Sequence, residues 1–138
     1  MLRPHSDVVA FDRATETLYD ALGIGGSYSD RTARSMFTLA MNVDYLAEVF
    51  AGDSVRIVSR LIDCDHKRIH YFHEMHHATK PCLVATSELL AMHIDMTTRR
   101  SEPFPAGAQT LLAEVKAAQA TLPLSPQVGR RIKIRVDR

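Results

Sequence analysis

The chain has 138 residues, a net charge of +1 and 46% hydrophobic residues, which is typical of one globular domain with a sizeable core. This balance of charge gives no electrostatic reason to expect a nucleic-acid or membrane partner. The first residues lack the apolar stretch of a signal peptide, and no run of about eighteen apolar residues could span a bilayer. We therefore expect a single domain, residues 1–138, located in the cytoplasm.

The first predicted element is a helix over residues 6–22. Its apolar residues recur at helical spacing over a wide arc, and flanking alanines permit close packing against a sheet. A cluster of glycines that starts at Gly23 ends this helix, and residues 27–34 are predicted to form a polar connection. The apolar face comprises Val8, Phe11, Ala14, Thr15, Leu18 and Leu22.

Four runs with strand character fill the middle of the chain, at residues 37–46, 55–62, 68–77 and 82–95. Their connections are too short for the crossover of about a dozen residues that parallel pairing needs, so we expect antiparallel hairpins. A turn at residues 51–53 is expected to lead the first strand into these hairpins, which gives a meander. In the third run, alternation predicts that one face is formed by Ile69, Tyr71, His73 and Met75.

The end of the chain is predicted to add one more helix. Pro103 and Pro105 keep the connector after the last strand irregular, and an amphipathic helix then runs from near Ala108 to near Thr121. A linker and a basic tail, residues 128–138, follow. One helix, a long antiparallel meander and a short second helix make an α+β domain, and the wide apolar arc of the first helix predicts a sheet that curves around it.

The two cysteines are predicted to be free thiols. Cys64 ends one strand of the hairpins, and Cys82 opens another at the opposite edge of the meander. About a dozen residues at roughly 3.3 Å each would separate them, against the roughly 6 Å between Cα atoms that a disulfide needs. Free thiols fit a reducing compartment.

Five of the seven histidines, His70, His73, His76, His77 and His93, are dense enough to raise the question of a metal site. On one strand, His73 and His77 share a face at roughly 13 Å, and His70 and His76 at roughly 20 Å. Both separations are too long to chelate one ion, so we expect no metal, although a cross-strand pair with His93 stays open.

Nine short segments, taken in order, resemble a known family. They cover nearly the whole chain, at residues 11–18, 37–38, 45–48, 52–53, 67–70, 85–88, 93–95, 103–104 and 129–133. The family is the hot-dog acyl-CoA thioesterases of the 4-hydroxybenzoyl-CoA thioesterase group, and the branch is the one that acts on betainyl-CoA in carnitine breakdown. The resemblance implies a hot-dog fold, hydrolysis of a small acyl-CoA, a homodimer or a tetramer, and no cofactor besides the CoA of the substrate.

One part of the family pattern is missing. Members of the group usually begin with a strand and an Asp-Tyr-Asn-Gly-His-Met-like segment, whose aspartate is the usual catalytic carboxylate. Here Met1-Leu2 stands where the last two residues of that segment would be. Either the recorded start lies downstream of the real one, or the protein has lost this carboxylate. The alternative to a thioesterase is therefore a catalytically inactive hot-dog dimer that binds acyl-CoA or serves as an interaction module.

Thioester hydrolysis needs a polarised carbonyl and a carboxylate that attacks or activates water. The start of the first helix offers unpaired amides and a positive dipole end, with Val8 and Val9 as expected donors. Asp7 is the nearest substitute for the missing aspartate, although a carboxylate there also complements the helix dipole. Glu88 is the second candidate, because it shares a strand face with apolar residues; a structural ion pair with an arginine would explain it equally well.

Basic residues at a hairpin corner, Lys67 and Arg68, together with His70, are the expected contacts for CoA. A plain solvated turn is the alternative for this corner. Aromatic faces would hold the quaternary ammonium of a betaine-type acyl group, unless these rings are simply core. The aromatic candidates are Phe11, Phe37 and Tyr45, with Tyr71 and Phe72 as further options.

Overall fold

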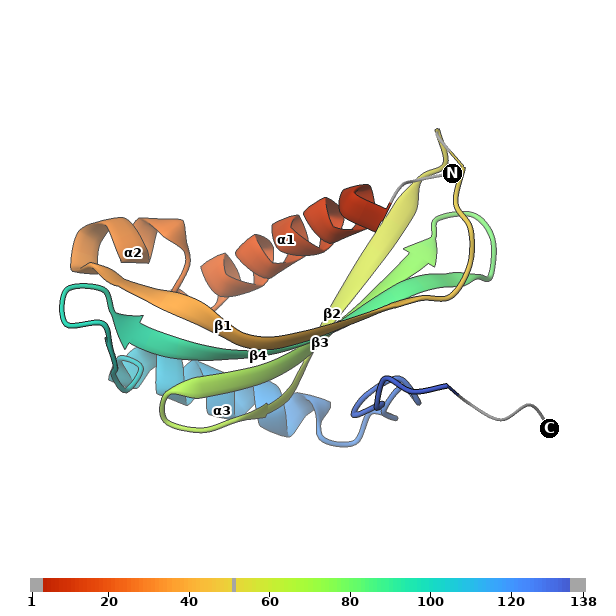
Figure 1. Ribbon diagram of the computed structural model, residues 1–138. Coiled ribbons are helices and arrows are strands. Elements are labelled where there is room, and N and C mark those ends of the chain that lie inside the picture. Colours follow the sequence, from red (N-terminus) through yellow and green to blue (C-terminus); the bar gives the residue numbers. More distant parts are fainter. Residues whose placement is uncertain (1–3, 51, 135–138) are drawn as a thin grey trace.

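The computed structural model describes residues 4–50 and 52–134, with side chains from residue 10 onward. A four-stranded antiparallel sheet, extended by one short strand, curves along a helix that crosses one of its faces (Figure 1). The α+β architecture predicted from the sequence is thus confirmed. In chain order the elements are α1 Pro4–Ala21, α2 Gly26–Thr32, β1 Arg34–Tyr45, β2 Val55–Cys64, β3 Arg68–His77, β4 Leu83–Asp95, β5 Arg100–Ser101 and α3 Ala106–Gln119.

The segment between α1 and β1 differs from its prediction. It was expected to be a polar connection, but it forms the short helix α2. Tyr28 of α2 is buried, and its hydroxyl lies 2.8 Å from Nε2 of His93 in β4. A polar sequence with one buried aromatic anchor therefore becomes helical, because a contact far away in the sequence holds it on the sheet.

The order of the strands in the sheet is β1-β4-β3-β2, with β5 paired to β4. The hairpins β2-β3 and β3-β4 are confirmed, but the expectation that β1 leads into the meander through a turn is wrong. The chain leaves β1 while still bonded to β4, since the amides of Leu46 and Ala47 both donate to the carbonyl of Val84, at 2.8 and 3.1 Å. Val49 then packs under α1, and this buried contact carries the connection across the sheet to β2.

Two groups of buried residues hold α1 on the sheet. The larger one lies under the second half of α1 and joins it to α2 and α3 through residues such as Tyr71 and Leu112. The smaller one lies under the first half of α1 and consists of Phe11, Val49, Met75, Val84 and Ala85. The predicted buried face of β3 is confirmed, since all its members are less than 1% exposed. The smaller group therefore fixes where α1 begins.

Helix α3 runs beside the edge strand β2. Gln119 accepts a hydrogen bond from the amide of Leu61 through Oε1 at 2.8 Å, and the Arg60 guanidinium donates to the carbonyls of Gln119, Leu122 and Pro123. These bonds satisfy both an edge amide of the sheet and the last carbonyls of the helix. Cys64 and Cys82 are free thiols, as predicted.

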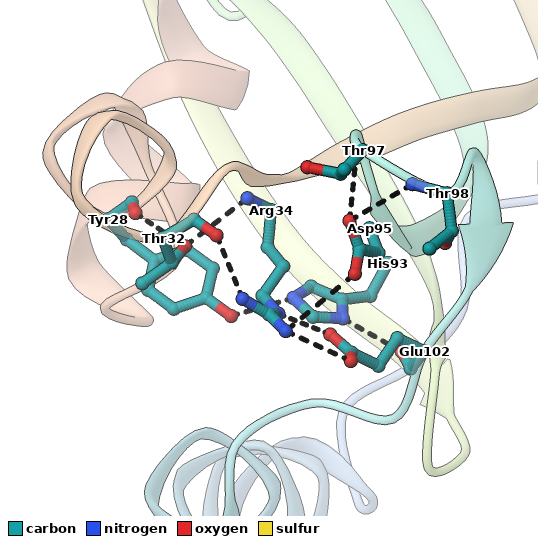
Figure 2. A network of polar contacts seen from close by, with 8 residues as sticks. All are labelled: Tyr28, Thr32, Arg34, His93, Asp95, Thr97, Thr98 and Glu102. Atoms are coloured by element: carbon teal, nitrogen blue, oxygen red, sulfur yellow. Dashed lines mark hydrogen bonds and ion pairs between the residues drawn. The ribbon is translucent and has the colours of Figure 1, made fainter.

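A polar network ties α2 to the end of the sheet (Figure 2). His93, 1% exposed, lies between the hydroxyl of Tyr28 and the carbonyl of Glu102, with both contacts at 2.8 Å. Because a carbonyl can only accept, the neutral ring carries its proton on Nδ1, and Nε2 accepts from Tyr28. Arg34 pairs with the carboxylates of Glu102 and Asp95. This network is structural, and it lies at the end of the sheet where α1 ends.

Removal of the Tyr28 hydroxyl should weaken this end of the molecule. In Tyr28→Phe, the acceptor nitrogen of His93 stays buried without a donor, which costs about 1–3 kcal/mol of unfolding free energy. Urea denaturation measures the change. The matched control is Tyr45→Phe, which removes the same hydroxyl from a side chain that is 50% exposed. Equal effects of the two substitutions would contradict the role of the network.

Candidate functional site at the start of α1

Helix α1 and strand β3 run in opposite directions and in step. The Tyr19 and Tyr71 hydroxyls lie 2.8 Å apart, and one helical turn earlier Thr15 Oγ1 lies 2.8 Å from Nε2 of His73. Four residues of helix advance about 6 Å, and two residues of strand advance about 6.6 Å. Two further steps of the same size bring Asp7 level with His77. The start of α1 therefore lies over the end of β3.

His77 is an unusual residue at that position. It is 8% exposed, and its Nδ1 accepts from the amides of Thr79 and Lys80, both at 3.2 Å, so the proton is on Nε2. Among the described residues Nε2 has no hydrogen-bond partner, and Oδ2 of Asp53 lies 3.4 Å away. A buried N–H donor that is left unpaired is costly in a folded protein, which makes His77 a candidate functional residue. Sequence reasoning treated His77 only as a possible metal ligand, and the orphaned proton could not be seen there.

The amides at the start of α1 are shifted relative to the prediction. Because α1 begins at Pro4, Val8 and Val9 lie where a helix uses its N–H groups for its own bonds, and the unpaired amides belong to His5 and Ser6. They carry the positive end of the helix dipole. The side chain of Asp7 lies outside the described side chains, so its role stays a prediction.

Glu88 lies away from this site. Its neighbours in β4, Ser87 and Leu89, are buried on the face that α1 covers, so Glu88 points to the other face of the sheet. There its Oε2 lies 2.6 Å from Nε2 of His70, and its Oε1 accepts from the amide of Gly129 at 2.8 Å. The partner that we find is thus a histidine rather than the arginine that the sequence suggested. Within one chain the two predicted carboxylates serve different surfaces.

The predicted CoA contacts lie at the β2-β3 corner. Arg68 and His70 line a hollow of about 190 Å³. Arg68 is bound to Asp65 at 2.6 Å, and although partial burial opposes the shift, hydrogen bonds from Arg68 and two amides lower the pKa of Asp65 to about 2. Lys67 donates to Ser101 Oγ at 3.2 Å. A phosphate at this corner would therefore share Arg68 with an ionised aspartate, and Lys67 is the less committed cation.

The predicted aromatic ligands do not form a cage within the chain. Phe11 is 3% exposed and stacks on His73 with a centroid distance of 5.9 Å, and Tyr71 and Phe72 are also buried. Phe37 and Tyr45 are 56% and 50% exposed, but they lie at opposite ends of β1. Their register partners, Met92 and Ala85, are on opposite faces of β4. Only these last two rings are accessible to a ligand, and they cannot enclose the same one.

Within the described residues, no three histidine, cysteine, aspartate or glutamate side chains are close enough together to hold a metal ion. The described helices likewise include none with the length and apolar character that a membrane crossing requires. Neither observation points to chemistry other than that of the helix start.

Comparison with known proteins now places the chain in a family. The family model described as the thioesterase-like superfamily matches residues 6–118. The chain belongs to this superfamily. A Staphylococcus aureus protein solved in complex with CoA has the same fold, with a TM-score of 0.90 and 27% identity over 97% of this chain and 84% of that one. The predicted hot-dog fold is thus confirmed, and the predicted thioester hydrolase is confirmed at the level of the family.

Curated relatives carry more specific names. A betainyl-CoA thioesterase of Pseudomonas aeruginosa is 29% identical over 131 residues, which is 95% of this chain and 82% of that protein. An L-carnitine dehydrogenase/betainyl-CoA thioesterase of Rhizobium meliloti is 26% identical over 128 residues, which is 93% of this chain but 26% of that protein. The chain thus spans about a quarter of the length of this second relative.

Proposed function

We propose that the chain hydrolyses the thioester of a small acyl-CoA to the free acid and CoA, with its reaction centre at the start of α1. The observation that carries the proposal is the level placement of Asp7 and the orphaned N–H of His77 beside the unpaired amides of α1. The superfamily supports the reaction class. The names of the relatives suggest betainyl or another short acyl group, and with it a place in carnitine breakdown.

The chemistry follows from these groups. The amides of His5 and Ser6 accept the developing negative charge on the carbonyl oxygen. Asp7 takes a proton from water, whose oxygen adds to the carbonyl carbon. The C–S bond then breaks, and the CoA sulfur receives the proton that Asp7 took. His77 donates its Nε2 proton to the carboxylate of Asp7 and holds it in place. Water is the only co-reactant, and no cofactor or metal enters any step.

A second copy of the chain is the expected partner. Strand β1 is the last strand in the sheet order, so its outer edge has no strand beside it within the described residues. Large apolar side chains along this strand are exposed, which an isolated edge strand would not sustain. Pairing of two copies through β1 supports a homodimer, and a tetramer would add a further contact. The exposed apolar residues are Phe37, Leu39, Met41 and Tyr45.

Paired carboxylate variants test the site. Asp7→Asn should lower kcat/KM by about 10²- to 10⁴-fold, because the amide cannot accept a proton from water. Glu88→Gln should leave kcat/KM nearly unchanged, because Glu88 lies on the other face of the sheet. The measurement is release of free CoA thiol from a panel of acyl-CoAs. Loss of turnover in Glu88→Gln, with Asp7→Asn active, would place the reaction on the wrong face; no turnover in the unaltered chain would favour the non-catalytic acyl-CoA binder.

A further inference from the structure

A groove of about 470 Å³ runs along α1 on the side that faces β2. This volume lies in the range of small-molecule sites. Aliphatic side chains line most of it, and the small residues of α1 leave the space open. Its lining begins at Ala10, about 6 Å along the helix from Ser6, and continues past Ala14 to Leu18, with Ile57 on the β2 side. A group held at the start of α1 can therefore extend directly into the groove.

The polar groups that line the groove are already satisfied. Ser59 Oγ lies 2.7 Å from Nδ1 of His73, whose Nε2 contacts Thr15 at 2.8 Å, and Thr17 donates to the carbonyl of Arg13 at 3.0 Å. Burial lowers the pKa of His73 to about 4, so the ring behind Ser59 is neutral near pH 7. The groove therefore presents no unpaired buried donor or acceptor and no anion to a ligand.

The charge around the groove also excludes a cationic ligand. No aromatic ring and no carboxylate is among the residues that line it, and these are the groups that recognise a quaternary ammonium. The charged group in its lining is the guanidinium of Arg13, which repels a cation and attracts the phosphates of CoA. A trimethylammonium group would lose its hydration here and gain no partner.

We propose that this groove binds the acyl group of the substrate, and that the group is uncharged and aliphatic rather than a betainyl group. The proposal rests on the proposed thioesterase function, and it adds the substrate class. It also predicts that the groove, which extends along α1 beyond Ala10, accepts acyl chains longer than the betainyl group.

A pair of substrates of equal shape tests the charge. Betainyl-CoA and 3,3-dimethylbutanoyl-CoA differ only in a quaternary nitrogen in place of a quaternary carbon. We expect kcat/KM to be at least about tenfold higher for the neutral substrate. A higher value for betainyl-CoA would overturn the inference and leave the proposed function intact. If neither substrate nor any other acyl-CoA is hydrolysed, the proposed function fails, and binding decides the fate of the groove.

Binding is measured with S-butyl-CoA and S-octyl-CoA, thioethers that cannot be hydrolysed. Each methylene buried in the groove should tighten binding up to about fourfold, so we expect S-octyl-CoA to bind at least about tenfold more tightly than S-butyl-CoA. Ala14→Phe fills the groove and should reduce this ratio to less than about twofold. The matched control, Ala118→Phe, adds the same ring to an exposed position of α3 and should keep the ratio. A ratio unchanged by Ala14→Phe would overturn the inference.

Discussion

Phe11→Ala lowers the free energy of unfolding by about 3–5 kcal/mol, the usual range for removal of a buried phenylalanine. The ring is 3% exposed, and it joins Met75, Val84 and Val49 in the group that fixes the start of α1. The cavity left by the ring would also free the first turns of the helix, so thioesterase activity should fall together with stability. Urea or thermal unfolding measures the first effect, and release of CoA thiol measures the second.

Phe37→Ala is the matched control, because it removes the same ring from a position that is 56% exposed. We expect a change in unfolding free energy of at most about 0.5 kcal/mol. The pair also separates the two hypotheses that the sequence left open for Phe11. A variant of Phe11 that stays fully stable and loses only its affinity for acyl-CoA would show a ligand contact instead of a core residue.

The stability of the protein should fall by about 3 kcal/mol as the pH drops from about 6.5 to about 4 because of His73 alone. Burial lowers the pKa of His73 from its usual 6.5 to about 4. In this window the unfolded chain binds the proton and the folded chain does not, so acid favours unfolding. The side chain is 0% exposed, and its neighbours Thr15, Ser59, Phe11 and Tyr71 include no carboxylate that would hold the charged form.

The measurement is a series of urea titrations between pH 7 and pH 4 on the unaltered chain and on His73→Gln. The glutamine variant starts at a lower stability but should lose about 3 kcal/mol less across the window, because it has no ring to protonate. The other histidines are common to both proteins and cancel in the comparison. Identical slopes for the two proteins would show that His73 is not held neutral by the fold.

The strands and the first helix were predictable because each carries its own periodic signal. The alternation in β3 identified its buried face residue by residue, and the glycine cluster after α1 marked the end of the helix. The position of β1 was not predictable in this way. Its pairing with β4 depends on Val49, which packs under α1, and on amides after β1 that bond to Val84. Such contacts join residues that are distant in sequence and leave no period to detect.

The site was predictable only in part, for a similar reason. The helix start was recognised from its dipole, and Arg68 and His70 do line one hollow. By contrast, parity placed Glu88 among apolar residues but could not say that this face is the one opposite α1. The unpaired proton of His77 depends on two amides of the turn after β3, and Phe11 is core because His73 stacks on it. Each of these outcomes is set by a neighbour in space.

The most direct test of the account is the rate of free CoA release by the purified 138-residue chain with a panel of acyl-CoAs, followed with a thiol reagent. The account predicts turnover with kcat/KM of at least about 10⁴ M⁻¹s⁻¹ on the best substrate, the lower end of the usual enzymatic range. A folded chain that binds CoA but releases no thiol from any member of the panel would contradict it.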